Sequence, residues 1–227
     1  MILSHAHKFI FLKTHKTAGT STELLLSQFC GRSDVITPLH PVDEALRIGR
    51  GPQNYAELLT WRAKLAKLRW QIRGLGPYPA FSEHTGAKRI RWVFGEQVWT
   101  DYFKFAIERN PWDREVSRYF WNTPPDRRPT FADFISCQTR PHPLNNFNIY
   151  SIDGKIAVDR VIHYEHFETE LRSVLADLKI PSDADIPRAK SQARGNQRGY
   201  REFYTPETRD IIASLYYREI AAFGYTF

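Results

Sequence analysis

Cysteine is scarce in this sequence, since only Cys30 and Cys137 occur among its 227 residues. Neither lies in a CxxC or CxxH cluster, the spacing at which structural zinc sites hold their ligands. We therefore expect no zinc site, and no residue cluster indicates another metal. Two isolated thiols are typical of a reducing compartment, and one disulfide between them is the alternative.

Long apolar runs are also missing, because no window reaches the roughly 18 apolar residues that a membrane-spanning helix needs. The first residues, MILSHAHKFIF, lack the basic segment, the long apolar segment and the cleavage site of a secretory signal. We therefore expect a cytoplasmic protein. A chain from which a membrane anchor had been removed would have the same features.

Basic charge is what the sequence has in excess, with a formal net charge of +7 and a pI of about 9.4. Such an excess favours an anionic partner, which could be a nucleotide, a nucleic acid, an acidic glycan or a membrane surface. Hydrophobic residues make up 42% and aromatic residues 14% of the chain. That content suffices for a large core, and we expect one domain over residues 1–227.

Strand and helix patterns follow each other along the chain. Residues 8–12 and 103–107 are apolar runs typical of buried strands, and each is followed by a helical pattern. Thr20 or Ser21 is expected to cap the first helix, and Asn110 with Pro111 to begin the second. These units predict an α/β fold in which helices cover a central parallel sheet. Both joints, at residues 13–21 and 108–117, then lie at the carboxyl edge of that sheet.

The later part of the chain continues this pattern. A hairpin is expected around Asp153-Gly154, then a strand in DRVIHYE, a helix over residues 167–178 and a last helix from Thr205-Pro206. The spacing of apolar residues predicts a basic amphipathic helix over residues 58–73. Three interpretations of this helix stay open: a solvated outer face, a surface that binds an anionic or neutral glycan, and a membrane-surface helix.

The first joint has the chemistry of an anion site. In KTHKTAGTS, residues 13–21, the backbone N–H groups at the helix start favour an anion, and Gly19 allows close approach. Hydroxyl groups and one ammonium, from Thr17, Thr20, Ser21 and Lys16, add donors. The order differs from the nucleotide-triphosphate loop GxxxxGK[ST], because the lysine precedes the glycine. An ordinary turn with a solvated lysine is the alternative.

The second joint, in AIERNPWDREVSRYF, places Arg109 at a strand end and Ser117 two turns into the next helix. Arginine suits a phosphate because its guanidinium makes two parallel hydrogen bonds. The alternative is that Arg109 pairs with Asp113 and that Ser117 is a surface residue.

Together these two motifs resemble the sulfotransferases that use 3′-phosphoadenosine 5′-phosphosulfate (PAPS), in particular the carbohydrate type related to the heparan sulfate and chondroitin enzymes and their bacterial members. HTGAKRIR, DRVIHYEHFETELRSVLADLKIP and the C-terminal residues are similar to the same family. The resemblance covers most of the chain and is weakest over residues 31–80, the expected acceptor-binding helical region. It implies a P-loop-like three-layer sandwich. His15 departs from the pattern, because many members carry proline there.

The resemblance implies a role for each matching residue. Lys16 corresponds to the lysine at the leaving oxygen, and the 5′-phosphosulfate is bound by Lys16, Thr17, Ala18, Gly19, Thr20 and Ser21. Arg109 and Ser117 correspond to the 3′-phosphate pair. Sulfuryl transfer, like phosphoryl transfer, is expected to pass through a loose transition state, so catalysis rests on positioning and electrostatics. The product is adenosine 3′,5′-bisphosphate (PAP), and no metal is expected.

Two further groups of residues complete the predicted site. The acceptor hydroxyl needs a general base, for which His84 is the first choice by resemblance and Glu83 the second. The loop over residues 189–201 carries Arg194, Arg198 and Tyr200, which we expect to close over the nucleotide, with a solvated surface loop as the alternative.

Two other functions stay open at this point. A small-molecule kinase would need ATP, magnesium and a glycine-first phosphate loop, and that loop is missing. A non-catalytic polyanion binder would need a basic module with interleaved aromatic residues, and none is recognisable. We expect a hydroxyl-bearing acceptor, most simply a carbohydrate, and no nucleic-acid partner. Peripheral membrane contact is not predicted, and the sequence does not indicate the oligomeric state.

Overall fold

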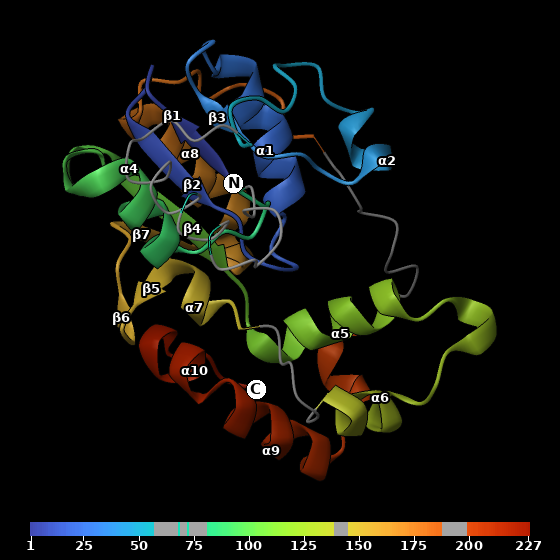
Figure 1. Cartoon of the computed structure of the whole chain (residues 1–227). Helices are drawn as coiled ribbons and strands as arrows, with labels where there is room; N and C mark the ends of the chain where they lie inside the picture. The colour runs from blue at the N-terminus through green and yellow to red at the C-terminus, as the bar shows by residue number, and fades with distance from the viewer. Residues whose placement is uncertain (57–67, 69–71, 73–80, 139–144, 188–198) are drawn as a thin grey trace.

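A computed structural model describes the chain apart from residues 57–67, 69–71, 73–80, 139–144 and 188–198. Two lobes are evident in Figure 1: an α/β lobe around a sheet, and a helical lobe that contains the C-terminus. The sheet lobe carries the strands β1 Ile2–Ser4, β2 Phe9–Leu12, β3 Val35–Ile36, β4 Phe103–Glu108 and β7 Arg160–His163. Its helices include α1 Gly19–Leu26, α2 Pro41–Glu44, α4 Ala87–Asp101, α7 Phe147–Tyr150 and α8 Phe167–Asp177.

The five-stranded sheet has the order β3-β1-β2-β4-β7. β2, β4 and β7 run parallel, whereas β1 is antiparallel to both of its neighbours. The predicted central parallel sheet is therefore confirmed over β2, β4 and β7, and the antiparallel strand β1 was not predicted. Only the residues between Ser4 and Phe9 join β1 to β2, and a parallel pair would need a crossover of a dozen or more residues.

Alternate residues of the strands face opposite layers of helix. Ile10, Leu12 and Ala106 pack in one core with Ala87, Ile90 and Val93 of α4. Phe9, Phe11 and Phe105 pack in a second core with Leu25 of α1 and Leu171 and Val174 of α8. Both faces are thus apolar and covered, as expected for parallel strands. The three-layer α/β prediction is confirmed, and Figure 1 shows the sheet between α1 and α4.

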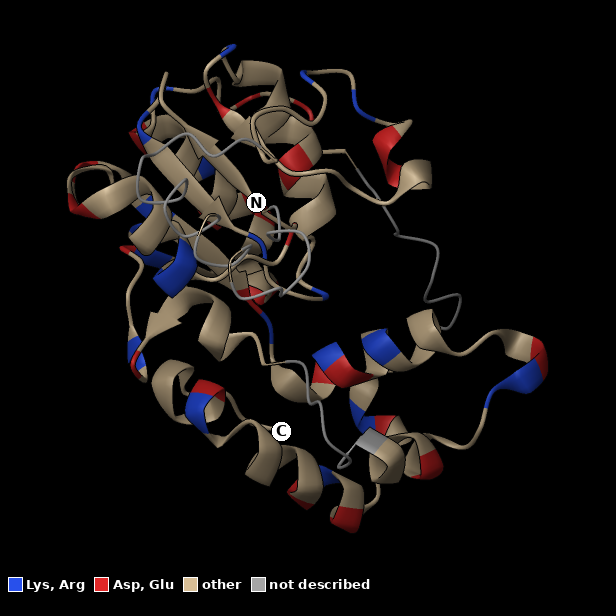
Figure 2. Cartoon of the chain, viewed as in Figure 1, with Lys and Arg blue, Asp and Glu red and all other residues tan. Residues whose placement is uncertain are grey.

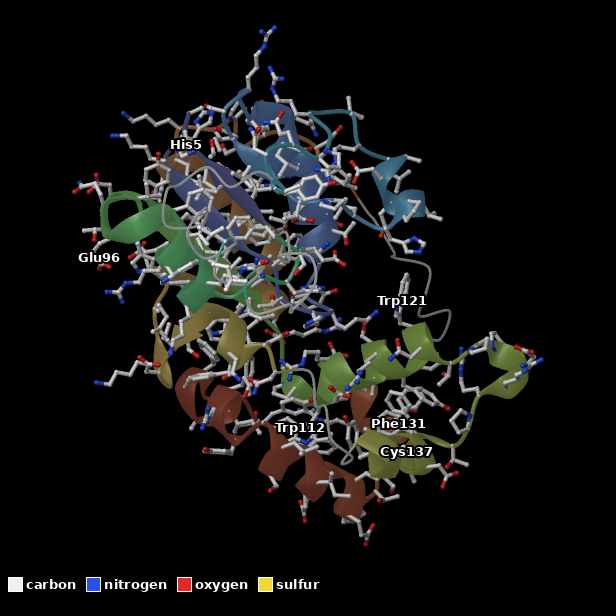
Figure 3. The ribbon with its side chains drawn as sticks, viewed as in Figure 1. His5, Glu96, Trp112, Trp121, Phe131 and Cys137 are labelled. Carbon is white, nitrogen blue, oxygen red and sulfur yellow. The ribbon has the colours of Figure 1, made fainter. Side chains whose placement is uncertain are left out.

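The helical lobe consists of α5 Pro111–Asn122, α6 Phe131–Gln138, α9 Pro206–Leu215 and α10 Tyr217–Phe223. A third core joins them, and Figure 3 shows Trp112 and Phe131 between these helices. The single last helix that we predicted is divided at Tyr216. This residue leaves helical geometry with φ −114° and ψ 30°, and its buried hydroxyl donates to Glu115 Oε1 at 2.7 Å.

The predicted hairpin and the predicted N-cap at Asn110 are confirmed. The hairpin is formed by β5 Ser151–Ile152 and β6 Lys155–Ile156, and Asn110 caps α5 by accepting from the Trp112 N–H at 3.1 Å. Helix α4 was not predicted. Its internal Gly95 has φ 86°, and the kink there divides the apolar repeat.

The structure also bears on the predicted helix over residues 58–73, on the two cysteines and on membrane-spanning helices. The amphipathic helix predicted over residues 58–73 lies outside the described residues except for Leu68 and Ile72, whose side chains are exposed. Cys30 and Cys137 are both free thiols, which argues against the disulfide alternative. Every helix within the described residues is too short or too polar to cross a lipid bilayer. Short single-turn helices occur at 27–29, 125–127, 164–166 and 200–203.

Candidate functional site

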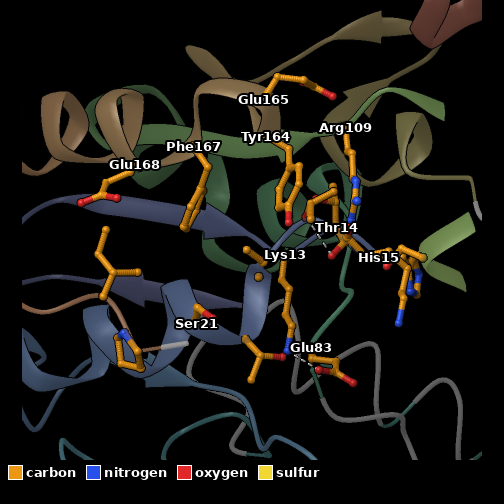
Figure 4. Close-up of a pocket in the computed structure, with 18 of the residues that line it drawn as sticks. Lys13, Thr14, His15, Ser21, Glu83, Arg109, Tyr164, Glu165, Phe167 and Glu168 are labelled. Atoms are coloured by element: carbon orange, nitrogen blue, oxygen red, sulfur yellow. Dashed lines mark hydrogen bonds and ion pairs between the residues drawn. The ribbon is translucent and has the colours of Figure 1, made fainter. Parts of the chain in front are cut away.

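A cavity of about 1030 Å³ opens at the carboxyl ends of β2, β4 and β7. Its wall combines the loop after β2, the residues at the end of β4, one face of α5 and the segment that leads into α8. Because β2 and β4 are parallel neighbours, both joints reach this edge of the sheet, as predicted. Figure 4 shows side chains of both joints facing one hollow.

The loop after β2 has an unusual backbone for an anion site. Lys16 and Ala18 both adopt left-handed conformations, with φ 61° and 60°. Ala18 is the N-cap of α1, and its own side chain makes no cap hydrogen bond. The predicted cap at Thr20 or Ser21 was therefore wrong, because both residues lie inside the first turn. First-turn N–H groups lack partners within a helix, so this end can accept an anion from the pocket.

Hydroxyl groups fix the base of the loop. The Thr14 and Thr17 hydroxyls lie 2.7 Å apart, and the Thr14 hydroxyl also donates to the carbonyl of Ile107 in β4. Thr20 and Ser21 are buried residues that line the pocket. The loop is thus tied to the neighbouring strand, with further hydroxyl groups at the pocket wall.

Lys13 is a buried residue that the sequence did not single out. Its ammonium pairs with Glu23 at 3.0 Å and also with Glu83, the contact drawn in Figure 4. Its stem lies under Gly19, where an added Cβ would come within 2.6 Å of Lys13 Cγ. The glycine is thus required by packing beneath the loop, in addition to the predicted close approach of a ligand.

Lys16 and Arg109 lie together at the pocket. The Arg109 Nη1 group donates to the Lys16 carbonyl at 3.3 Å. The Lys16 ammonium lies 4.3 Å from the ring centre of Trp121, a half-exposed residue near the end of α5 that Figure 3 labels. The sequence analysis missed Trp121, because the loop that meets it is more than a hundred residues away along the chain.

Arg109 also forms the ion pair that we gave as its alternative. Its Nε and Nη2 groups donate to Asp113 Oδ2 at 2.9 and 2.6 Å. The described hydrogen bonds engage three of its five N–H groups, so the guanidinium retains capacity for an anion. The ring centre of Tyr164 lies 4.2 Å from Cζ of the Arg109 guanidinium, and Ser117 lines the same pocket from α5. Tyr164 is a second residue that the sequence analysis missed.

His84 is oriented by a backbone contact. Its Nδ1 lies 3.0 Å from the Lys13 carbonyl. Because a carbonyl only accepts, Nδ1 carries the hydrogen, and Nε2 holds the lone pair of the neutral ring. Burial lowers the pKa of His84, and the Lys13 carbonyl and Glu83 oppose this only in part. The ring centres of His84 and His15 lie 3.6 Å apart with their planes tilted by 31°, and burial and His84 lower the pKa of His15 to about 3.

Glu83, the second predicted base, is held as an anion. Burial would raise the pKa of its carboxyl, but the Lys13 ammonium, His84 and the N-terminal ammonium together leave that pKa below its ordinary value. Glu83 Oε1 lies 3.7 Å from His84 Nε2, close enough to stabilise a protonated imidazole. A carboxylate already paired with an ammonium is a weaker base than a free one.

Of the three loop residues predicted to close over the nucleotide, only Tyr200 lies within the described residues. Arg194 and Arg198 lie outside the described residues. Tyr200 packs edge-on against Phe227, and its hydroxyl lies 3.5 Å from Asn110 Nδ2. It is not among the described residues that line the pocket, so this position does not support the predicted stacking on adenine. Within the described part of the chain, no group of three His, Cys, Asp or Glu residues is placed to hold a metal.

Charge of both signs surrounds the pocket. Figure 2 shows basic residues in both lobes, mixed with acidic residues in the described part of the chain. Arg118 and Arg172 line the pocket alongside Glu165 and Glu168. The arrangement suits a ligand with separate anionic groups better than a long uniform polyanion.

Of three comparisons with known proteins, the match to a family model identifies the family. A family model described as the sulfotransferase family matches residues 1–226. A protein from Archaeoglobus fulgidus, described as uncharacterized, is 30% identical over 114 residues, which cover 48% of this chain and 93% of that protein. The structure of mouse sulfotransferase SULT7A1 complexed with PAP aligns with 98% of this chain and 87% of its own, at 13% identity and a TM-score of 0.49.

The contact beneath the loop gives a stability prediction. Gly19→Ala should lower the free energy of unfolding by about 1–3 kcal/mol, because the new methyl group overlaps a lysine stem that two ion pairs hold in place. Gly51→Ala is the matched control, since a Cβ there meets nothing within 4 Å. Urea unfolding of both variants measures the difference, and equal stabilities would contradict the packing account.

Proposed function

The chain belongs to the sulfotransferase family, and we propose that its pocket binds PAPS and transfers the sulfuryl group to a hydroxyl of a carbohydrate. One observation carries the proposal: the lysine-bearing loop after β2 and Arg109 at the end of β4 line one cavity, and Arg109 contacts the Lys16 carbonyl. The loop that we assign to one anion and the arginine that we assign to a phosphate thus line the same cavity of about 1030 Å³.

The 5′-phosphosulfate is assigned to the first joint. The start of α1 supports this choice, because the N-cap residue Ala18 makes no side-chain cap hydrogen bond and a bound anion can accept from first-turn N–H groups at the pocket. The Thr20 and Ser21 side chains add hydroxyl donors at the same wall. The loop from Lys16 to Ser21 therefore supplies the binding groups that the resemblance implies.

The 3′-phosphate is assigned to the second joint. Arg109 is buried and oriented by Asp113, so little side-chain entropy is lost when an anion binds to its remaining N–H groups. Ser117 lies on the same wall and adds a hydroxyl. Tyr164, next to Arg109, and Phe167 offer aromatic surface for the adenine, and their rings lie 6.2 Å apart.

Lys16 is assigned the electrostatic role in the reaction. During transfer, the bond between sulfur and the bridging oxygen breaks while the acceptor oxygen bonds to sulfur. Negative charge grows on the bridging oxygen, and the Lys16 ammonium stabilises it most in the transition state. Trp121 holds this ammonium at the pocket by a cation–π contact before the donor arrives.

His84 is assigned the general base. Its Nε2 lone pair can take the proton of the acceptor hydroxyl, while the Lys13 carbonyl holds the opposite nitrogen. Glu83 can then stabilise the imidazolium that forms. A carbohydrate acceptor is favoured by the resemblance and by Trp121, a half-exposed aromatic ring at the pocket on which a sugar can stack.

Direct assay tests the proposed function. The protein, incubated with PAPS and a panel of oligosaccharides, should add one sulfuryl group to an acceptor, detected by mass. Lys16→Ala should lower kcat by about 100-fold or more, because one donor at a developing charge is worth roughly 3–4 kcal/mol. Transfer of a phosphoryl group from ATP with magnesium, and none from PAPS, would support the kinase instead.

The choice of base gives a pH prediction. His84 must be neutral to accept a proton, and burial lowers its pKa. We expect kcat/KM to fall as the pH drops through a pKa below the ordinary histidine value of about 6.5. His84→Gln should lower kcat roughly 100-fold or more and remove this acidic limb. A limb near or below pH 4.3, the ordinary glutamate value, would identify Glu83 as the base instead.

A further inference from the structure

We propose that Asn146 is a positioning residue that holds the lysine-bearing loop in the conformation needed for transfer. The proposal deepens the proposed function and rests on it. Asn146 lies directly before α7, far from the loop in sequence, and its side chain is fully buried. Neither joint motif includes it.

Asn146 binds both backbone polar groups of His15. Its Oδ1 accepts from the His15 N–H at 2.9 Å, and its Nδ2 donates to the His15 carbonyl at 3.1 Å. A planar amide in this orientation pairs with the loop as a neighbouring strand would. His15 immediately precedes Lys16, so the paired peptide groups set the direction in which the lysine leaves the backbone.

A third hydrogen bond joins Asn146 to the second joint. Its Nδ2 also donates to Glu108 Oε1 at 3.2 Å. The same carboxylate oxygen accepts from the Arg109 N–H at 2.9 Å and from Arg114 Nη1 at 2.6 Å. One buried amide therefore connects the loop assigned to the 5′-phosphosulfate with the strand end assigned to the 3′-phosphate.

The local helix does not explain this side chain. Asparagine at an N-cap commonly accepts from the first turn of its own helix. Asn146 occupies the N-cap of α7 but makes no side-chain cap hydrogen bond. All three of its described side-chain bonds go to the two joints instead.

The loop needs such support. Lys16 has φ 61°. A left-handed conformation costs a non-glycine residue roughly 1–2 kcal/mol, and contacts from the surrounding structure must offset that cost. Asn146 Nδ2 binds the carbonyl of the peptide before Lys16, and Arg109 Nη1 binds the carbonyl of Lys16 itself. Without Asn146 we expect the loop to relax and the ammonium to leave the position where charge develops.

Kinetics of Asn146→Ala and Asn146→Asp test the proposal. Both remove the donor to the His15 carbonyl, and the aspartate also places a second carboxylate beside Glu108. We expect kcat to fall roughly 10- to 100-fold with the KM of the acceptor unchanged, because a misplacement of about 1 Å can cost that much. Assays are run where circular dichroism shows each variant to be folded.

Asn145→Ala is the matched control. Asn145 is exposed and accepts only from the Asn148 N–H in the described structure, so its kcat should equal that of the wild type. A kcat equal to that of the wild type in both folded Asn146 variants would overturn the proposal. So would an equal fall of kcat in Asn145→Ala, or a fall of kcat/KM in the Asn146 variants that comes entirely from a higher acceptor KM.

Hydrogen exchange on the wild type keeps the test decisive if the variants do not fold. The His15 amide should exchange slowly in the free protein, because Asn146 accepts its hydrogen, and rapid exchange would overturn the proposal. A wild type that transfers no sulfuryl group would overturn the proposed function alone, because the exchange measurement does not depend on activity.

Discussion

A single buried carboxylate, that of Glu108, holds the functional edge of this protein together. It has no exposure to solvent, and it accepts from the Arg109 backbone, Arg114, Asn146 and Tyr150. Burial and Glu108 raise the pKa of the Tyr150 phenol, which keeps that group a neutral donor. Removing one partner of a buried ion pair costs about 3–5 kcal/mol, so the joints that meet at Glu108 are expected to keep their relative positions.

Two lysines three residues apart have different surroundings and therefore different tasks. Lys13 is buried between Glu23 and Glu83, and its carbonyl also orients His84, so it joins the loop to the segment that carries the proposed base. Lys16 faces the pocket with its ammonium over Trp121. Lys16 and Arg109 thus present positive charge to the pocket alongside Arg118 and Arg172, while Lys13 offsets the acidic groups beneath the loop.

The sequence was sufficient to locate both joints, because short apolar runs followed by helix-start signals depend on neighbouring residues. The Asn110 cap and the alternative pairing of Arg109 with Asp113 were visible for the same reason. The left-handed backbone at Ala18 was not, since no glycine marks it. Neither were the contacts of Lys13 with Glu83 and of Asn146 with His15, because the partners are 70 and 131 residues apart.

The central claim is that the two joints bind opposite ends of one nucleotide. Calorimetric titration of the wild type and Arg109→Ala with PAP and with adenosine 5′-monophosphate, which lacks the 3′-phosphate, tests it most directly. The account predicts that Arg109→Ala weakens PAP binding by about 10- to 150-fold, the effect of a hydrogen bond to a charged group, and weakens binding of the monophosphate much less, because there the variant loses only the contact with the Lys16 carbonyl. Equal losses for both nucleotides, or no loss for PAP, would contradict it.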